Sequence, residues 1–493
     1  MRINRLIKGP SAKFGCLYGQ ARQAQKANGS TLPSTGGRTV TIFGLMQSPP
    51  ASPVVTNYFL PPVEDEIGLT ASYLAEHFAQ TERWEAESLA ALQLRQAAEM
   101  IRYAQKYSPF YKDRLAGIDV APGAGLTPEE FATIPFLTRE DVQNAKDSLF
   151  STKLPRGHGP AFDLHTTGSS GQPVHVKSTK YSSLFNMAVT LRGHRWFGRD
   201  LAGTNVTIKV ISGGRGRVKT KSWAAGSTGA GFTYSNRIPV NQLYDWLFAD
   251  DPQYLQCHPS ILKELIYRSL DVGAKPGRLR DVRSMGEILE PGLRTLCQRE
   301  WGVPVRDNYS CEELATLALT CPEHDHLHIQ AERVLLEVLN DGNQPCAPGE
   351  VGRVVVTGLI NFATPLIRYE LGDRAAAGAV CPCGRGLGVI ERIIGRERLP
   401  VILPSSDRLF PVLDAEPLLL KGGVRQYQLT QISTEAIDLK LVTDLRLSEV
   451  EEADITAHLQ RNFGYPFRFR FIYVDKIPRE PGGKFQIFKS DLI

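Results

Sequence analysis

Short apolar runs alternate with helical segments between residues 160 and 310, and this alternation constrains the fold more than any other feature. Val206–Ile211 has the length and the β-branched content of a buried strand. Leu243–Phe248 and Ile261–Ser269 instead have the apolar spacing of helices. Strands that alternate with helices form a sheet whose crossover helices cover its faces. The sequence therefore predicts an α/β fold for this region.

The flanking regions predict further helices and strands. Residues 64–115 are rich in Ala, Leu, Glu and Gln, with apolar residues three and four apart, so we expect helix with a stop at Ser108–Pro109. Thr127, followed by Pro128, and Thr138 have the pattern of helix N-caps. Strands are predicted at 327–329, 333–339 and 352–357, and a hairpin at 401–410.

The C-terminal region is a smaller α/β unit. From about Gln426 the pattern predicts a strand, then a helix over Ser448–Asn462, then a strand over Phe467–Val474. This unit is about the size of an independent domain. We expect three parts: a basic extension (1–63), a large N-terminal domain with mixed sheets and helices (64–396), and a small C-terminal domain (397–493).

Charge is distributed unevenly along the chain. The net charge is +5, but residues 1–63 contain seven Lys and Arg and no acidic residue, so the remainder carries −2. A nearly neutral body gives no argument for a nucleic-acid partner. No apolar run approaches the ~18 residues of a membrane span, so we expect no membrane partner and a cytoplasmic location. The extension itself predicts a disordered tail, with an organelle transit peptide or a start at Met46 as alternatives.

A run of hydroxyls and glycines, Thr166–Pro173, has the composition of a phosphate-binding loop. Glycine lets the backbone approach a bulky anion, and Ser and Thr hydroxyls add hydrogen-bond donors. The loop is not a Walker A motif, because Gln172 and Pro173 stand where Lys and Ser/Thr are required. An ordinary surface loop is the alternative, and a phosphate site would need its cation from elsewhere in the chain.

Three charged residues have the chemistry of a nucleotide site. Glu313, shortly after a predicted strand, is a candidate Mg²⁺ ligand; alternatively it lies in the first turn of a helix. Asp373 can accept hydrogen bonds from ribose hydroxyls, or it lies in a plain Gly-Asp turn. Lys484 ends a Gly-rich hairpin from which it can neutralise developing negative charge, or it is an exposed turn lysine.

Eight cysteines in 493 residues do not indicate a disulfide scaffold, but the segments Cys321–His328 and Cys381–Cys383 together offer three thiols and three imidazoles. Structural zinc takes four Cys or His ligands in tetrahedral geometry. The predicted ligands are Cys321, His328, Cys381 and Cys383. Free thiols beside a strand are the alternative, since the spacing is not that of a standard zinc finger.

The order of these motifs resembles the adenylate-forming superfamily, and in particular its phenylacetate–CoA ligase-like branch. The resemblance rests on the hydroxyl loop, Gly286-Glu287, Tyr309–Glu313, Arg368–Asp373, Gly395-Arg396 and Gly483-Lys484. It covers the chain from about Ala90 to the C-terminus. It implies ATP, Mg²⁺ and CoA as cofactors, with a closed structural Zn²⁺ site. It also implies that the small C-terminal α/β domain is mobile.

The resemblance also implies roles for individual residues. Lys484 and Glu313 are the predicted catalytic residues, with Glu313 holding Mg²⁺ and Lys484 contacting the α-phosphate. The predicted nucleotide-binding residues are Thr166, Thr167, Gly168, Ser169, Ser170, Gly171, Gly286, Glu287, Asn308, Tyr309, Asp373 and Arg396. Within that set, the hydroxyl loop wraps the β- and γ-phosphates. Gly286 and Glu287 line the adenine and acyl-carboxylate region, and Asp373 binds the ribose.

The implied reaction is activation of a carboxylic acid, expected to be aromatic, as an acyl-adenylate, followed by transfer to CoA. Two departures bear on it: Gln172 replaces a common lysine, and Gly395-Arg396 is followed by Glu397-Arg398-Leu399-Pro400 at the hinge. An adenylylating synthetase, an acyl acceptor other than CoA, and a non-catalytic nucleotide-binding relative remain alternatives. The acid is not identified by the sequence, and the oligomeric state, including a homodimer, stays open.

Overall fold

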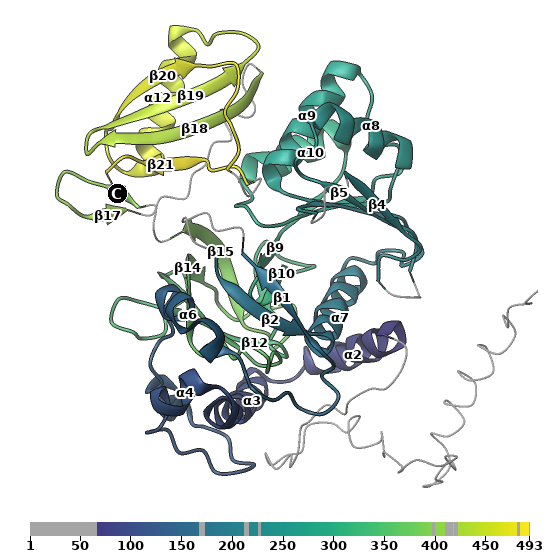
Figure 1. Ribbon diagram of the computed structural model, residues 1–493. Coiled ribbons are helices and arrows are strands. Elements are labelled where there is room, and N and C mark those ends of the chain that lie inside the picture. Colours follow the sequence, from purple (N-terminus) through teal and green to yellow (C-terminus); the bar gives the residue numbers. More distant parts are fainter. Residues whose placement is uncertain are drawn as a thin grey trace, which may run out of the picture. The chain divides into compact units, whose positions relative to one another are not determined.

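The computed structural model describes residues 67–166, 173–211, 216–224, 228–396, 400–409, 418, 423–480 and 484–492 (Figure 1). The chain divides into two compact units, Met1–Ser48 and Pro49–Ile493, and every described residue belongs to the second. The predicted basic extension, residues 1–63, lies outside the described residues. Among the described helices, none is both long and apolar enough to cross a lipid bilayer.

Five α-helices and one 3-10 helix precede the first strand in the described part of the chain. They are α2 (Ile67–Thr81), α3 (Ala86–Tyr107), α4 (Pro109–Arg114), α5 (Pro128–Ala132), α6 (Arg139–Ala145) and the 3-10 helix η2 (Lys146–Leu149). The predicted stop is confirmed, because Ser108 has extended backbone angles and Pro109 begins the next helix. Thr127 and Thr138 are confirmed as N-caps, and each forms a capping box with the third residue of its helix. Such caps stabilise a helix by about 1 kcal/mol.

A seven-stranded antiparallel sheet packs against the N-terminal helices and α7 (Lys180–Trp196). A hairpin of β1 (Ala161–His165) and β2 (His175–Thr179) leads into α7. The sheet has the order β12-β13-β14-β15-β11-β10-β9. Its strands are β9 (Asn308–Cys311), β10 (Ala315–Thr320), β11 (Leu327–Ile329), β12 (Val334–Leu339), β13 (Val351–Gly358), β14 (Tyr369–Ala377) and β15 (Val389–Arg396). The predicted strands at 327–329, 333–339 and 352–357 are confirmed, whereas β10 and β15 were not identified from the sequence.

The predicted α/β region forms a separate six-stranded sheet of order β4-β5-β3-β6-β7-β8. Its strands are β3 (Asn205–Lys209), β4 (Arg217–Thr220), β5 (Gly231–Ser235), β6 (Tyr254–Cys257), β7 (Asp281–Ser284) and β8 (Val305–Arg306). All neighbours are parallel except β4 and β5. The helices α8 (Val240–Asp250), α9 (Pro259–Val272) and α10 (Pro291–Trp301) cover one face (Figure 1). Apolar side chains of alternate strand residues pack against these helices.

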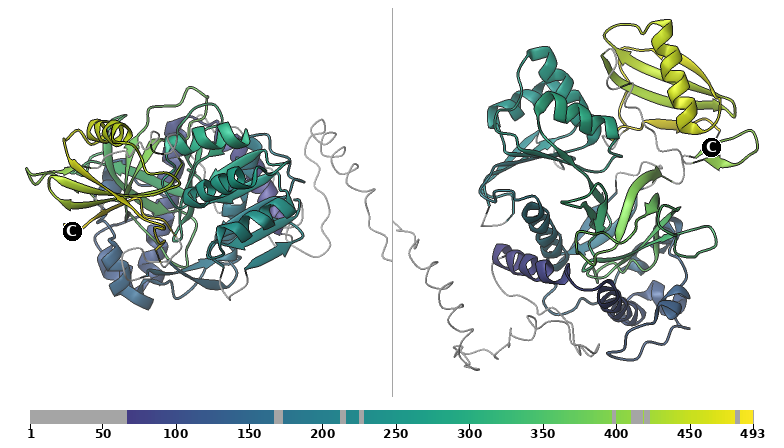
Figure 2. Two further views of the ribbon diagram at one scale, coloured as in Figure 1. Left: turned by 90° about the horizontal axis from the view of Figure 1, so that it is seen from above. Right: turned by 180° about the vertical axis from the view of Figure 1, so that it is seen from behind.

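The C-terminal region adds a four-stranded sheet with one helix across its face (Figure 2). A short hairpin of β16 (Val401–Ile402) and β17 (Arg408–Leu409) confirms the hairpin predicted at 401–410. The sheet order is β20-β19-β18-β21, and its elements are β18 (Val424–Ser433), β19 (Ala436–Thr443), α12 (Glu449–Phe463), β20 (Arg468–Tyr473) and β21 (Phe488–Ser490). The predicted strand, helix and strand are confirmed, and β19 is an additional strand paired with β18.

Two large apolar cores hold these layers together. One joins the N-terminal helices and α7 to the seven-stranded sheet. The other joins the six-stranded sheet, its helices and the four-stranded sheet. Tyr267 on α9 donates a hydrogen bond of 2.8 Å to the Val424 carbonyl, and Arg425 pairs with Asp271 at 2.7 Å. These contacts join α9 to the start of β18.

Candidate active site

Lys484 and Gly286 come together at the carboxyl end of the parallel strands. Gly286 follows β7 and has φ +73°, a conformation that favours glycine. A Cβ at this position would lie 3.2 Å from the ring of His258 and 3.7 Å from Cε of Lys484. Ligands in parallel α/β sheets bind at this end of the strands. Two predicted site residues that are almost 200 positions apart are thus neighbours.

Glu287 holds the C-terminal segment in this position. Its Oε2 accepts the Ser260 N–H at 3.0 Å, and its Oε1 accepts the Ser260 hydroxyl at 3.0 Å and the Phe485 N–H at 2.7 Å. Arg479 adds a charge contact of 3.8 Å. Since Phe485 follows Lys484, the carboxylate fixes the backbone that carries the lysine. The predicted lining role of Glu287 stays a prediction, because its oxygens face these partners.

Asp373 lies within strand β14 rather than in a turn. It pairs with Arg396 of β15 in the sheet register, and Arg396 Nε is 3.0 Å from Asp373 Oδ1. Tyr309 of β9 donates its hydroxyl to Asp373 Oδ2 at 2.8 Å. The turn interpretation of Gly372-Asp373 is therefore wrong: Gly372, at φ +76°, lies in an irregular stretch of the sheet register.

The buried surroundings of Asp373 shift the pKa values of the two side chains that contact it, Tyr309 and Arg396. Burial, with the neighbouring Asp373 carboxylate, raises the pKa of Tyr309 well above its usual value. Asp373 in turn raises the pKa of Arg396. Both side chains therefore keep their protons at neutral pH, so Tyr309 stays a hydrogen-bond donor. Asn308, beside it, has a buried side-chain oxygen without a hydrogen-bond partner among the described residues.

Glu313 lies in the turn between β9 and β10, so the interpretation that it opens a helix is wrong. Its Oε1 accepts the Tyr369 hydroxyl at 3.4 Å and lies 3.6 Å from Nη1 of Arg139. The same guanidinium donates through Nη2 to Oγ1 of Thr166 at 3.3 Å. Arg139 therefore connects the candidate metal carboxylate to the first residue of the hydroxyl loop.

The hydroxyl loop is described only at its ends. Thr166 exchanges two bonds with Val174, through its N–H (3.0 Å) and its Oγ1 (2.8 Å), and His165 pairs with His175 across the β1–β2 hairpin. Extended segments thus flank the loop, as expected. The other predicted residues, Thr167, Gly168, Ser169, Ser170 and Gly171, lie outside the described residues.

Sequence reasoning missed Arg139 and His258. Arg139 is the first residue of α6, where a positive charge opposes the helix dipole. A basic residue directly after a strong N-cap was a signal that could have identified it. His258 directly follows a strand of the parallel sheet, the usual position of site residues, but its contact with Gly286 depends on the tertiary fold.

The cysteine and histidine residues form a second, buried cluster. Cys321 Sγ lies 3.8 Å from Cys381 Sγ, and Cys383 Sγ lies 3.4 Å from His328 Nε2. Zn–S bonds of about 2.3 Å in tetrahedral geometry separate two sulfurs by about 3.8 Å. Backbone N–H groups donate to Cys321 (3.4 Å) and Cys381 (3.5 Å). The donor set fits zinc.

The same cluster contains one residue that was not predicted. His326 has a ligand atom within 4.8 Å of those of Cys321, His328 and Cys381. Its Nε2 is buried without a hydrogen-bond partner among the described residues. Burial lowers the pKa of His328 to about 4, so this imidazole is neutral, the form that binds metal. Its Nδ1 faces the Leu387 carbonyl at 3.4 Å, which orients Nε2 toward the sulfurs.

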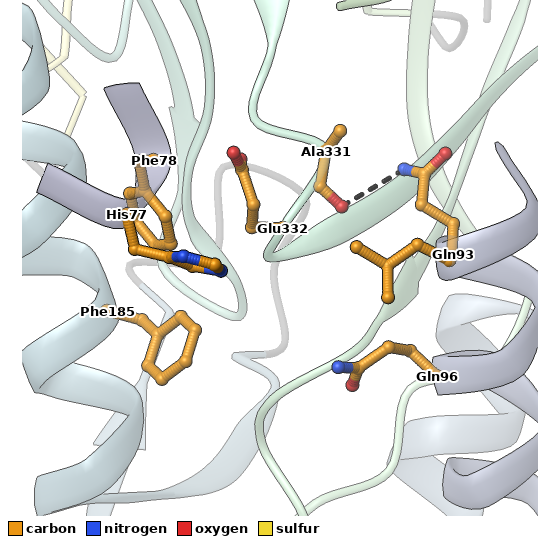
Figure 3. Close-up of a pocket in the computed structure, with 8 residues that line it drawn as sticks. His77, Phe78, Gln93, Gln96, Phe185, Ala331 and Glu332 are labelled. Atoms are coloured by element: carbon orange, nitrogen blue, oxygen red, sulfur yellow. Dashed lines mark hydrogen bonds between the residues drawn. The ribbon is translucent and has the colours of Figure 1, made fainter. Parts of the chain in front are cut away.

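A small pocket elsewhere in the fold contains none of the predicted site residues (Figure 3). It lies between α2, α3, α7 and the loop before β12, with His77, Gln93 and Glu332 among its lining residues. Gln93 donates to the Ala331 carbonyl at 3.2 Å, and Glu332 pairs with Arg192. These contacts close a seam between helices and sheet.

Comparisons with known proteins agree on one fold. The family described as the CapK C-terminal domain matches residues 418–491. Protein CapK of Staphylococcus aureus is 23% identical over 461 residues, covering 88% of this chain and 96% of that protein. Phenylacetate-coenzyme A ligase of Thermus thermophilus is 24% identical over 441 residues, covering 81% and 95%. A crystal structure of 2-hydroxyisobutyryl-CoA ligase in the postadenylation state matches with TM-score 0.72 at 17% identity, covering 88% of this chain and 94% of that one.

Proposed function

The chain has the fold of the adenylate-forming superfamily and its relatives fit the phenylacetate–CoA ligase-like branch, and we propose that it is an acid–thiol ligase. It activates a carboxylic acid, expected to be aromatic, with ATP and transfers the acyl group to CoA. The observation that carries this proposal is the meeting of Lys484 with Gly286 at the carboxyl ends of the strands. Cytoplasmic location, the homodimer and a domain boundary after Arg396 stay predictions.

The proposed reaction has two steps. A carboxylate oxygen of the acid attacks the α-phosphorus of ATP, and the bond to pyrophosphate breaks. The CoA thiolate then attacks the acyl carbon, and AMP leaves. In the first step negative charge increases on the α-phosphate and on the leaving pyrophosphate, so placed cations are the main catalytic contribution of the protein. We assign Lys484 to the α-phosphate and the attacking carboxylate.

The nucleotide contacts follow from the remaining residues. Asp373 would accept the ribose hydroxyls, exchanging part of its contacts with Tyr309 and Arg396. Asn308 has a buried acceptor that suits the exocyclic amine of adenine. Glu313 would hold Mg²⁺, which takes one or two carboxylates together with phosphate oxygens. Since Arg139 contacts both this carboxylate and Thr166, we infer that it also faces the β- and γ-phosphates.

Acid-dependent release of pyrophosphate tests the proposal. The folded protein is incubated with ATP, Mg²⁺ and a panel of aryl and alkyl carboxylic acids, and pyrophosphate is measured with and without CoA. We expect release with at least one acid. Folded protein that releases none with any acid would contradict an acid-activating function and favour the non-catalytic relative.

Lys484→Ala should lower acid-dependent pyrophosphate release by about 100-fold or more, the usual cost of removing a group that stabilises transition-state charge. The dissociation constant for ATP should change much less, because the interaction is made chiefly in the transition state. Lys489→Ala is the matched control, since Lys489 lies on β21 and pairs with Glu480 at 3.0 Å. Equal rates for Lys484→Ala and Lys489→Ala would refute the role of Lys484.

Arg139→Ala should raise the KM for ATP by about tenfold, because a charge-assisted contact to phosphate is worth roughly 1.5–3 kcal/mol. The KM for the acid should change little, and Arg139→Lys should recover part of the ATP affinity. Arg114→Ala serves as the control, because Arg114 of α4 pairs with Asp141 of α6, the helix that carries Arg139. An effect confined to the acid KM would show that Arg139 does not face ATP.

We further propose that the Cys/His cluster holds one structural zinc ion, with Cys321, Cys381, Cys383 and one of the two histidines, His326 or His328, as its four ligands. Metal analysis of purified protein should give about one zinc per chain. Cys381→Ser should lose it and lower the melting temperature, since structural zinc contributes directly to folding. Cys346→Ser, outside the cluster, should keep full zinc content. Only trace zinc in the unmodified protein would reject the site.

One observation favours a second candidate acceptor. The acidic residue after Gly395-Arg396 stands directly after the arginine, and Pro400 follows soon after, so the hinge departs from the pattern that the resemblance implies. The adenylate would then pass to an acceptor other than CoA. Adding CoA after the adenylate has formed distinguishes the two: rapid AMP release supports the thioester step, and an unchanged slow rate supports another acceptor.

A further inference from the structure

One face of the six-stranded sheet is polar. Thr207 of β3 pairs with Thr233 of β5 and with Gln256 of β6, and Gln256 pairs with Arg283 of β7. Paired residues of neighbouring strands point to the same face, so these side chains form one row across four strands. The alternate residues, among them Val206 and Leu255, are buried in the apolar core with α8, α9 and α10. The polar row therefore faces away from those helices.

Arg283 is the unusual member of this row. It is 4% exposed, and its Nη2 is buried without a hydrogen-bond partner among the described residues. The guanidinium lies against α7, where a Cβ at Gly193 would come 2.5 Å from Nη2. Among the described residues, none forms a hydrogen bond or an ion pair with it. A glycine in the facing helix thus makes room for a cation that no other described side chain pairs with.

The surrounding charges do not neutralise Arg283. The nearby carboxylate of Asp281 already pairs with Arg199 and lies 3.8 Å from Arg306. Burial, with Arg283 and Arg199, keeps the pKa of His194 well below its usual value, so this imidazole is neutral. Three guanidinium groups therefore share one carboxylate, and the region carries excess positive charge.

A buried, unpaired cation is unfavourable in a folded protein, and almost all buried polar groups have a partner. The partner that best matches a guanidinium is a carboxylate, which accepts two parallel hydrogen bonds from it. An anionic ligand group at this position would provide the missing partner. Thr207 and Gln256, which are half-buried in the same row, offer further hydrogen bonds beside it.

The row is close to the proposed reaction centre. Gly286, beside Lys484, is three residues after Arg283, and three residues of chain span at most about 10 Å. His258, which also lies at Gly286, is two residues after Gln256. One aromatic ring or a chain of about five carbons can connect an acyl carboxylate at Lys484 to a second group at Arg283.

We propose that the acid activated by this protein carries a second carboxylate, which Arg283 binds while Lys484 faces the reacting one. This inference rests on the proposed ligase function. The polar row is the specificity-determining region, and the substrate is a dicarboxylic acid rather than a simple aryl or alkyl acid.

Matched pairs of acids test the substrate class in the unmodified protein. Phenylacetate is compared with 4-carboxyphenylacetate, and hexanoate with adipate, by acid-dependent pyrophosphate release. In the pair that gives the higher activity, we expect kcat/KM to be at least tenfold higher for the diacid than for the monoacid. Equal or lower values for both diacids would overturn the inference while leaving the ligase function intact. No release with any acid would instead contradict the ligase function itself.

Arg283→Met tests the assigned residue. The ratio of kcat/KM for diacid to monoacid should fall at least tenfold, and the melting temperature without ligand should not fall, because an unpaired buried charge is removed. If Arg283 is purely structural, its replacement would lower kcat/KM equally for both acids and leave the ratio unchanged. That result would overturn the assignment. Arg278→Met is the control, since Arg278 pairs with Asp251 at an exposed position. If Arg283→Met does not fold, the preference of the unmodified protein decides.

Discussion

The candidate site depends on the hydrogen bonds that the Glu287 carboxylate accepts. It accepts hydrogen bonds from the Ser260 N–H and hydroxyl at the start of α9 and from the Phe485 N–H in the C-terminal segment. Charge-assisted hydrogen bonds of this kind are about twice as strong as neutral ones. Together with the pairing of Arg479 with Glu264 at 2.7 Å, they hold Lys484 beside Gly286. The proposed chemistry therefore depends on an acidic side chain that does not itself react.

The distribution of positive charge explains how the proposed phosphate loop can lack a lysine. Arg139 reaches the loop from the first turn of α6, and Lys484 reaches the strand ends from the C-terminal segment. Arg283 provides a third cation further down β7. Because each belongs to a different element, the charges meet only in the folded chain. Separate placement also lets each cation face a different anionic group.

Local signals predicted the elements well, because caps and strands are encoded within a few residues. Thr138 is an example: its capping box depends only on Asp141, three positions away. The ordered motifs predicted the fold class because their sequence order is itself the signal. The secondary structure around Glu313 and Asp373 was harder to predict, since a turn, a helix start and an irregular strand have similar local composition. Their partners, Tyr369 and Tyr309, come from other strands.

The contacts that the sequence could not supply are long-range ones. His326 joins the cysteine cluster only because β10, β11 and the loop before β15 meet there. Arg283 has no ion-pair partner within the described part of the chain, since the nearby Asp281 pairs with Arg199. Neither fact depends on residue type alone. Both depend on which side chains the sheets bring together, and this is also why substrate class was not legible from the sequence.

The central claim is that a carboxylate attacks the α-phosphorus of ATP. An acid labelled with ¹⁸O in its carboxylate groups tests it directly, because the bridging oxygen stays with AMP when the acyl group leaves. The products are analysed by mass spectrometry after complete turnover with CoA or another thiol. The account predicts one ¹⁸O atom in AMP and none in pyrophosphate. Label in inorganic phosphate with formation of ADP, or unlabelled AMP, would contradict it.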